Sequence, residues 1–211
     1  MIEKTSAIPV AIYPYSSQSQ IIHWFTLHHG LISTLLKSSL HPKSLFLGQF
    51  QLFGTTELLY HLRPNEKLNI AKECYLLKCR NEYRSNWRAM QIASYLTSIF
   101  KKILPYEAPA PQLFYHLELL LDYTIDFYSQ PLYLPWSELS ILKIEGNYPE
   151  LKSLSADLNK VVKILLNSES PHNLPYKNLD ISLIKSLNNL TGGFVSGTYQ
   201  LPMKHRKAIQ L

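Results

Sequence analysis

The spacing of apolar residues changes once along the chain, near residue 80, and this change constrains the fold more than any other feature. Before it, apolar segments of strand length are separated by turn signals such as HHG, in which Gly30 can adopt a positive φ without steric cost. After it, apolar residues recur at helical spacing. The sequence therefore predicts an α+β chain, with a β-domain over residues 1–80 and an α-helical domain over residues 81–211.

The N-terminal part predicts about five strands and has no segment of helical length, which favours a small β-barrel over a βαβ unit. The OB-fold is the commonest barrel of this size. Gly48 and Gly54 predict bulges or sharp bends. The strand-length segments are AIPVAIYPY (7–15), QIIHWFTL (20–27), GLISTLLKS (30–38), LFLGQFQLFG (45–54), TTELLYHL (55–62) and LNIAKECYLL (68–77).

The C-terminal part predicts five helices, each recognised by an apolar face and by Pro, Ser or Gly at its ends. The first is expected to begin near residue 80 and to end before Pro105. The predicted helical segments are 80–104, 109–130, 135–146, 151–168 and 180–193.

The net charge of +6 is unevenly distributed. Residues 1–102 hold twelve Lys or Arg against five Asp or Glu, whereas residues 103–200 hold six against ten. Three more basic residues follow in 201–211. A localised positive field attracts phosphate, although a merely solvated basic face is the alternative on charge alone.

Signatures of catalysis and targeting are lacking, so we expect neither an enzyme nor a cofactor. The sequence contains no phosphate loop, no dinucleotide fingerprint, no zincin motif and no nucleophile elbow. The start of the chain does not resemble a signal peptide, and no apolar run is long enough to span a membrane, so we expect a cytoplasmic protein.

No metal site is expected either. Cys74 and Cys79 have no second cysteine pair and no histidine at finger spacing, which favours ordinary thiols over zinc ligands. His28 and His29 are adjacent and favour a turn over a ligand pair. Asp122 and Asp126 lie one helical turn apart and favour a solvated face over an acid/base or metal couple.

Basic residues of the N-terminal half form the strongest candidate for a binding surface. If the first helix begins near residue 80, Arg80, Arg84 and Arg88 form one stripe along it. Trp24, Phe25, Phe46, Phe50 and Tyr60 could either stack on bases or fill the barrel core, and the core is favoured. The candidate DNA-binding residues are Lys37, Lys43, Lys72, Lys78, Arg80, Arg84, Arg88, Lys101 and Lys102.

Several segments, taken in order, resemble the N-terminal domain and first helix of the RecO recombination-mediator family. The resemblance covers residues from about 8 to 151. The segments that carry it are YPYSSQSQIIHWFTLHHGLISTLLKSS, HPKSLFLGQFQLF, TELLYHL, the junction from KECYLL to NWRAMQIASYL, and SELSILKIEGNYPEL.

This resemblance implies an OB-fold followed by a helical domain, in a nucleoid-associated protein that binds single- and double-stranded DNA. It also implies annealing of strands coated by single-stranded DNA-binding protein (SSB), and loading of RecA together with RecR. Lys37 and Lys43 match the family's basic positions, whereas Ser38 and Ser39 replace a Gly-Ala pair. Many members carry a four-cysteine zinc module that is expected to be absent here, because residues 149–211 contain no cysteine.

Two other functions remain open on the sequence. The helical domain could instead be an adaptor that captures an acidic peptide such as the SSB tail, with Lys143 at the rim of its groove. A small nuclease would need clustered carboxylates near the basic face, and the five acids of that half are scattered.

Overall fold

The chain divides into two compact units in a computed structural model, and each is described by itself. The barrel unit comprises Met1–Asn81 and Ile103–Glu118, and the helical unit comprises Glu82–Lys102 and Leu119–Leu211. Helix α3 (Pro111–Phe127) contributes its first part to the barrel unit and the remainder to the helical unit. The structure describes residues 1–63, 66, 68–147, 154–175, 180–202, 206 and 209.

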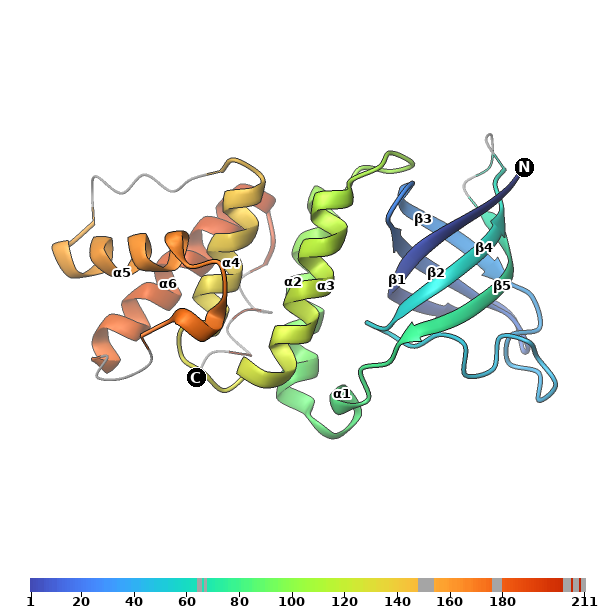
Figure 1. The fold of residues 1–211 in the computed structure, drawn as a ribbon, viewed down its shortest axis with the longest axis horizontal. Helices are drawn as coiled ribbons and strands as arrows, with labels where there is room; N and C mark the ends of the chain where they lie inside the picture. The colour runs from blue at the N-terminus through green and yellow to red at the C-terminus, as the bar shows by residue number, and fades with distance from the viewer. Residues whose placement is uncertain are drawn as a thin grey trace. The chain divides into compact units, whose positions relative to one another are not determined.

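Five strands close into a barrel in the order β1-β2-β3-β5-β4 (Figure 1). β3 and β5 pair in parallel, and all other pairs are antiparallel. This architecture confirms the predicted OB-fold. The strands are β1 (Ile2–Pro14), β2 (Gln20–Thr26), β3 (Gly30–Leu36), β4 (Thr55–His61) and β5 (Asn69–Lys78).

The length of β1 allows the barrel to close without a free edge. Its first half pairs with β4 from Ile2 to Ala7, and its second half pairs with β2 from Ala7 to Pro14. The register with β2 shifts between Pro9 and Ala11, which is a β-bulge that bends the strand. One strand thereby joins both neighbours around the barrel.

Alternating residues of the strands fill the barrel interior. The indole Nε1 of buried Trp24 donates a hydrogen bond to Thr34 Oγ1 at 2.8 Å, which satisfies a polar group that burial would otherwise leave unpaired. The core cluster comprises Ala7, Ile22, Trp24, Ile32, Leu36, Phe46, Leu58, Tyr60, Ala71 and Cys74.

The prediction of a strand over 45–54 is wrong. This segment belongs to a long connection of turns and bends between β3 and β4. Phe46 leaves the connection to enter the barrel core, so its apolar character reflects burial of single residues and not a pleated strand. The predicted turn at HHG is confirmed, with φ of +60° at Gly30.

Residues 103–118 pack against the barrel although they are separated from it in sequence. The amide of Leu31 donates to the carbonyl of Pro105 at 3.0 Å, and a Cβ at Gly30 would lie 2.3 Å from the carbonyl oxygen of Ala108. The rings of Phe25 and Phe114 meet edge to face at 5.5 Å. Glycine at position 30 therefore permits both the turn and the close approach of this segment.

The helix predicted to begin near residue 80 is in fact two helices, α1 (Glu82–Ser85) and α2 (Trp87–Ile103). Asn86 separates them, and its side-chain Oδ1 accepts a hydrogen bond from the amide of Ala89 at 3.0 Å. This is an N-cap, which favours a new helix start over continuation of the old one. The apolar spacing could not distinguish the two cases because both helices turn their apolar residues inward.

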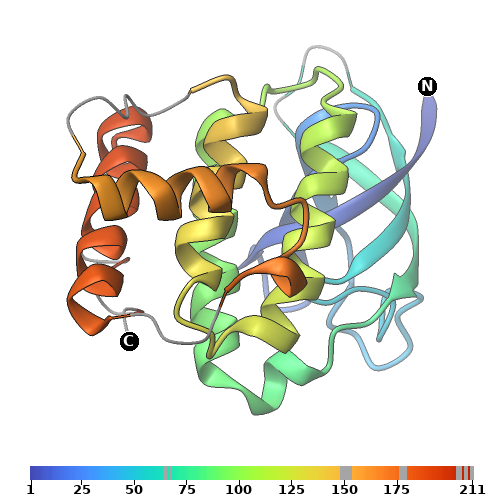
Figure 2. The same cartoon turned by 60° about the vertical axis from the view of Figure 1, so that its left-hand side comes forward.

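The remaining helices are α4 (Tyr133–Ile144), α5 (Ala156–Asn167) and α6 (Ile181–Tyr199), with a short 3₁₀ turn at Pro171–Asn173. They pack against one another, and α5 runs across the direction of α4 (Figure 2). Ser155 caps α5, while residues 151–153 of the predicted helix lie outside the described part of the chain. α6 continues past its predicted end at Gly193, because burial of Val195 on the same helix face outweighs the helix-propensity cost of the two consecutive glycines.

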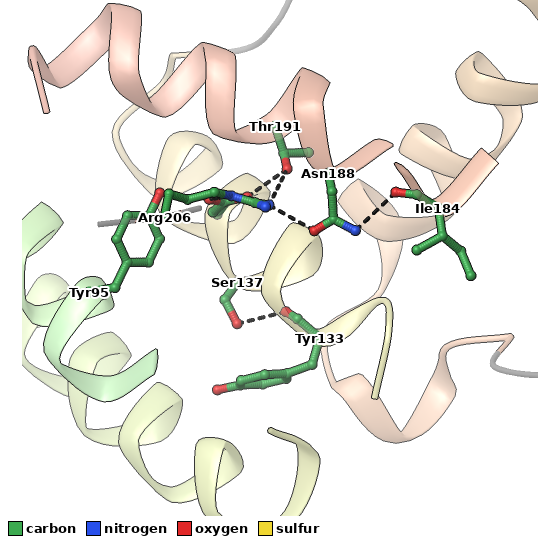
Figure 3. A network of polar contacts seen from close by, with 8 residues as sticks. Tyr95, Tyr133, Ser137, Ile184, Asn188, Thr191 and Arg206 are labelled. Carbon is green, nitrogen blue, oxygen red and sulfur yellow. Dashed lines mark hydrogen bonds and ion pairs between the residues drawn. The ribbon is translucent and has the colours of Figure 1, made fainter. Parts of the chain in front are cut away.

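A buried polar network joins α2, α4 and α6 to Arg206 (Figure 3). Arg206 Nε and Nη2 each lie 2.9 Å from a carboxylate oxygen of Glu138, and both side chains are fully buried. The hydroxyls of Tyr95 and Thr191 donate to the same carboxylate. Burial lowers the pKa of Arg206, but its hydrogen bonds and the charge of Glu138 outweigh this and raise it.

Candidate nucleic-acid interface

The outer face of strands β1, β2, β3 and β5 carries residues in rows that follow the strand register. Tyr13 is opposite Ile21, Ile21 opposite Leu35, and Leu35 opposite Ile70. Tyr13 is exposed and the other three are half-buried, whereas neighbouring Ile22 and Leu36 point into the core. We call Tyr13, Ile21, Leu35 and Ile70 the central row.

Two of the predicted DNA-binding lysines follow the paired residues Leu35 and Ile70 along the chain. β3 and β5 pair in parallel at these residues, and each segment reaches a lysine two residues later, Lys37 just past the end of β3 and Lys72 within β5. Both side chains are exposed. Lys37 and Lys72, which we call the basic edge, therefore place two positive charges beyond the same end of the β3–β5 pairing.

Lys43 and Lys78 lie elsewhere on the barrel unit. Lys43 is exposed in the turn that follows the basic edge, where its amide donates to His41 Nδ1 at 3.1 Å. Lys78 is opposite Thr55 at the far end of β5, six residues and roughly 20 Å along the strand from Lys72. The structure therefore does not gather all four lysines into one cluster.

The prediction that Arg80 lies on an exposed stripe is wrong. Its side chain is only 2% exposed and donates to the carbonyl of Phe53 at 2.7 Å, to Thr55 Oγ1 and to the carbonyl of Glu118. It precedes α1, and therefore shares no helix with Arg84 and Arg88. Arg80 ties residues 103–118 to the barrel and is not available to phosphate.

Arg84, Arg88, Lys101 and Lys102 belong to the helical unit. Arg84 is exposed on α1, whereas half-buried Arg88 donates to the carbonyl of Ile209 at 3.3 Å. Lys102 is exposed, and partial burial lowers the pKa of Lys101. These four residues are distributed over two helices and do not form the predicted single stripe.

Most of the aromatic residues proposed as stacking candidates form the core. Trp24, Phe25, Phe46 and Tyr60 are buried, and Phe50 is half-buried against the core cluster. The outward ring of Tyr13 was not among these candidates, although the alternation of β1 could have identified it, because Ile12 beside it points inward.

The opposite end of β3 is acidic. Glu3 Oε2 lies 3.6 Å from His29 Nε2 in the β2–β3 turn. Burial raises the pKa of Tyr60, and the charges of Glu3 and Glu107 raise it further, so both carboxylates lie near this end. The charges at this end of β3 are therefore opposite in sign to that of Lys37, which follows its other end.

The described residues contain neither a candidate metal cluster nor a helix suited to span a membrane. Among the described residues, no group of three or more His, Cys, Asp or Glu side chains is arranged to hold a metal ion. Within the same part of the chain, no helix is both long and apolar enough to cross a bilayer. Cys74 is buried and Cys79 is exposed, and neither is in a disulfide.

Comparison with known proteins identifies the barrel. Residues 1–80 match the family described as "Recombination protein O N terminal". The barrel thus resembles the N-terminal domain of RecO proteins. The predicted RecO resemblance is thereby confirmed.

Two curated relatives named DNA repair protein RecO support this resemblance. The chain is 27% identical over 157 residues to the DNA repair protein RecO of Prosthecochloris aestuarii, which covers 72% of this chain and 58% of that protein. It is 31% identical over 77 residues to the DNA repair protein RecO of Chlorobium phaeobacteroides, covering 36% of this chain and 30% of that protein. The chain thus spans less than two thirds of the length of either RecO relative.

Proposed function

We propose that this chain is a DNA repair and recombination mediator. It binds single- and double-stranded DNA, anneals complementary strands, and acts with RecR to load RecA on DNA coated by SSB. The observation that supports this proposal is the basic edge, in which exposed Lys37 and Lys72 lie beyond the same end of the β3–β5 pairing in an OB-fold barrel. The resemblance to RecO proteins supplies the biological context.

The chemistry of this function needs no acid/base group. Two strands repel each other through their phosphates, and lysines that neutralise phosphates lower this repulsion as the strands approach. Contacts to phosphate carry no direct sequence information, so binding is expected to tolerate any sequence. This agrees with the lack of catalytic motifs in the sequence.

The test is DNA binding and annealing across a salt series with the full chain. Replacing Lys37→Glu and Lys72→Glu together should weaken binding to all sequences alike. Loss of these two contacts should reduce the slope of log affinity against log salt by roughly 0.7 per contact on single strands. Annealing of two complementary oligonucleotides should slow in parallel.

A matched control makes the same charge change on the helical unit. Lys160 and Lys163 are exposed on α5, so Lys160→Glu with Lys163→Glu alters net charge equally without touching the barrel. Equal losses in both double variants would mean that overall charge, and not the basic edge, governs binding. An unchanged affinity in the barrel variant would reject the proposed surface.

A protein-interaction adaptor is the second candidate, favoured by the 72% exposure of Trp87, which follows exposed Arg84 by three residues. An exposed apolar ring and a cation near it in sequence suit an acidic peptide such as the SSB tail. Lys143 is a weaker candidate for the rim of a peptide-binding groove, because its Nζ already donates a hydrogen bond to the carbonyl of Leu166 at 2.8 Å. Binding of an SSB-tail peptide that is lost in Trp87→Ala, together with no DNA affinity, would favour this function.

A further inference from the structure

We infer that Tyr13, supported by His23 and accompanied by Tyr15, forms a stacking site for unpaired DNA bases. This inference rests on the proposed function and adds a second kind of contact to it. The basic edge would hold phosphates of either DNA form, whereas the tyrosine site would act only on bases outside a duplex.

The ring of Tyr13 is both accessible and supported. The Tyr13 side chain is 44% exposed at the end of β1, in the central row. Its ring centroid lies 5.1 Å from that of His23 on β2, at an interplanar angle of 62°. An edge contact of this kind restrains the ring, so less conformational freedom is lost when a base binds.

Tyr15 adds a second exposed ring close by. It follows Tyr13 by two residues and is 60% exposed, and its amide donates to the carbonyl of Ser19 at 3.0 Å. Tyr15 lies just past the end of β1, in the turn that leads to β2. Its exposed ring offers a second surface for a base.

The positive charge at this end of the barrel identifies the occupant. The central row runs from Tyr13 through Ile21 and Leu35 to Ile70. Exposed Lys37 precedes Ser38, whose amide donates to Ser19 Oγ at 3.1 Å, and the carbonyl of Ser19 accepts from the amide of Tyr15. A single strand has phosphates for the lysines and base faces for the rings, and it matches both features at once. In a duplex the base faces already stack on one another, so only the phosphates remain available.

The rest of the outer face of the barrel limits where a single strand of DNA can bind. Residues 103–118 cover the same face farther toward the β2–β3 turn, where Phe114 packs on Phe25 and Pro105 bonds to Leu31. The acidic Glu3 and Glu107 also lie toward that end. The open part of the face is therefore the part that holds Tyr13 and the basic edge.

The experiment compares three probes of equal length: oligothymidylate, the same backbone with abasic sites, and a mixed-sequence duplex. The full chain should bind oligothymidylate more tightly than the abasic strand. Tyr13→Ala should weaken oligothymidylate binding roughly fivefold to a hundredfold and leave the other two probes unchanged. Tyr13→Phe keeps the ring and should restore the affinity for oligothymidylate.

Tyr75→Ala is the matched control, because Tyr75 is another exposed barrel tyrosine, opposite Glu57 on β4. Equal losses for Tyr13→Ala and Tyr75→Ala would overturn the stacking site, as would equal affinity of the wild type for oligothymidylate and the abasic strand. Equal weakening of single strand and duplex by Tyr13→Ala would also overturn it. Failure of every probe to bind the wild type would reject the proposed function together with the site, whereas the preceding outcomes reject the site alone.

Discussion

At the residue scale, Gly30 meets two demands at once, a left-handed φ and the absence of a Cβ. Its φ is +60°, and an added Cβ would lie 2.3 and 2.4 Å from the carbonyl oxygens of Ala108 and Pro105. Gly48 has a similar φ of +75° but open space around the Cβ position. The two glycines therefore separate the cost of backbone strain from the cost of a steric clash.

We predict that Gly30→Ala destabilises the protein clearly more than Gly48→Ala. The Gly48 variant should lose about 1 kcal/mol in free energy of unfolding, because only the left-handed conformation is penalised. The Gly30 variant should lose more, since residues 105–108 must move away from β3. Urea unfolding measures both, and equal losses would contradict the tight packing of residues 105–108.

His116 on α3 provides a prediction about pH. Burial lowers the pKa of His116 to about 4, whereas the free side chain titrates near 6.5. Between these values the unfolded chain binds a proton that the native protein does not bind, so stability rises with pH across this window. Acidification from pH 6.5 toward 4 should therefore reduce the free energy of unfolding.

The measurement is urea unfolding of the wild type and His116→Gln at several pH values. Other groups titrate in the same range, so the informative quantity is the difference in slope between the two proteins. The variant should show the shallower dependence. Parallel curves for the wild type and His116→Gln would exclude this role of His116.

At the scale of elements, the polar network around Glu138 joins three helices of the helical unit to Arg206. Arg206→Met should cost about 3–5 kcal/mol, because the carboxylate remains buried without its cation. Adding Glu138→Gln to this variant should recover part of the loss, since it removes the unpaired charge. Urea unfolding of the single and double variants tests this expected non-additivity.

An exposed ion pair supplies the control for the buried one. Lys4 Nζ lies 2.9 Å from Glu57 Oε1, with both side chains accessible to solvent. Lys4→Met should cost less than about 1 kcal/mol. If Arg206→Met were equally mild, the network would not be important for holding α2, α4 and α6 together.

The predictability of these elements depended on whether a local pattern determined them. Alternation and turn chemistry predicted the OB-fold strands, and helical spacing predicted most helices. The segment 45–54 was predicted as a strand because of its apolar residues. Phe46 is apolar because it enters the barrel core as a single residue, and not because the segment is a strand. The break at Asn86 was missed because an N-cap inside an apolar pattern leaves the spacing almost unchanged.

The candidate site was less predictable because it depends on distant partners. Burial of Arg80 depends on Phe53, Thr55 and Glu118, which no local window contains. The basic edge depends on the parallel pairing of β3 with β5, which joins segments far apart in sequence. Charge counting placed the candidate site in the N-terminal half of the chain but could not group its lysines.

At the scale of the whole molecule, the barrel unit is discontinuous in sequence. It consists of residues 1–81 together with 103–118, although the match to the RecO N-terminal family ends at residue 80. A fragment of residues 1–81 lacks Phe114 over Phe25 and Glu118 beside Arg80. We predict that this fragment unfolds at lower urea concentration and binds a hydrophobic dye.

A protein that carries residues 103–118 again tests whether their loss causes the lower stability of the fragment. Residues 1–81 can be joined to residues 103–118 by a Gly/Ser linker as long as the replaced segment 82–102. This protein should lose the dye binding and unfold cooperatively at higher urea than the fragment. If the fragment alone were already as stable, residues 103–118 would contribute little to the barrel.

The discontinuity of the barrel unit also affects how the protein is made. On the ribosome all five strands emerge before residues 103–118, so the newborn barrel exposes Phe25 and leaves Arg80 without Glu118 until synthesis reaches the start of α3. At ordinary rates of translation this interval lasts a few seconds. During this time the nascent chain presents an apolar surface, which makes it a natural client for chaperones that act at the ribosome exit.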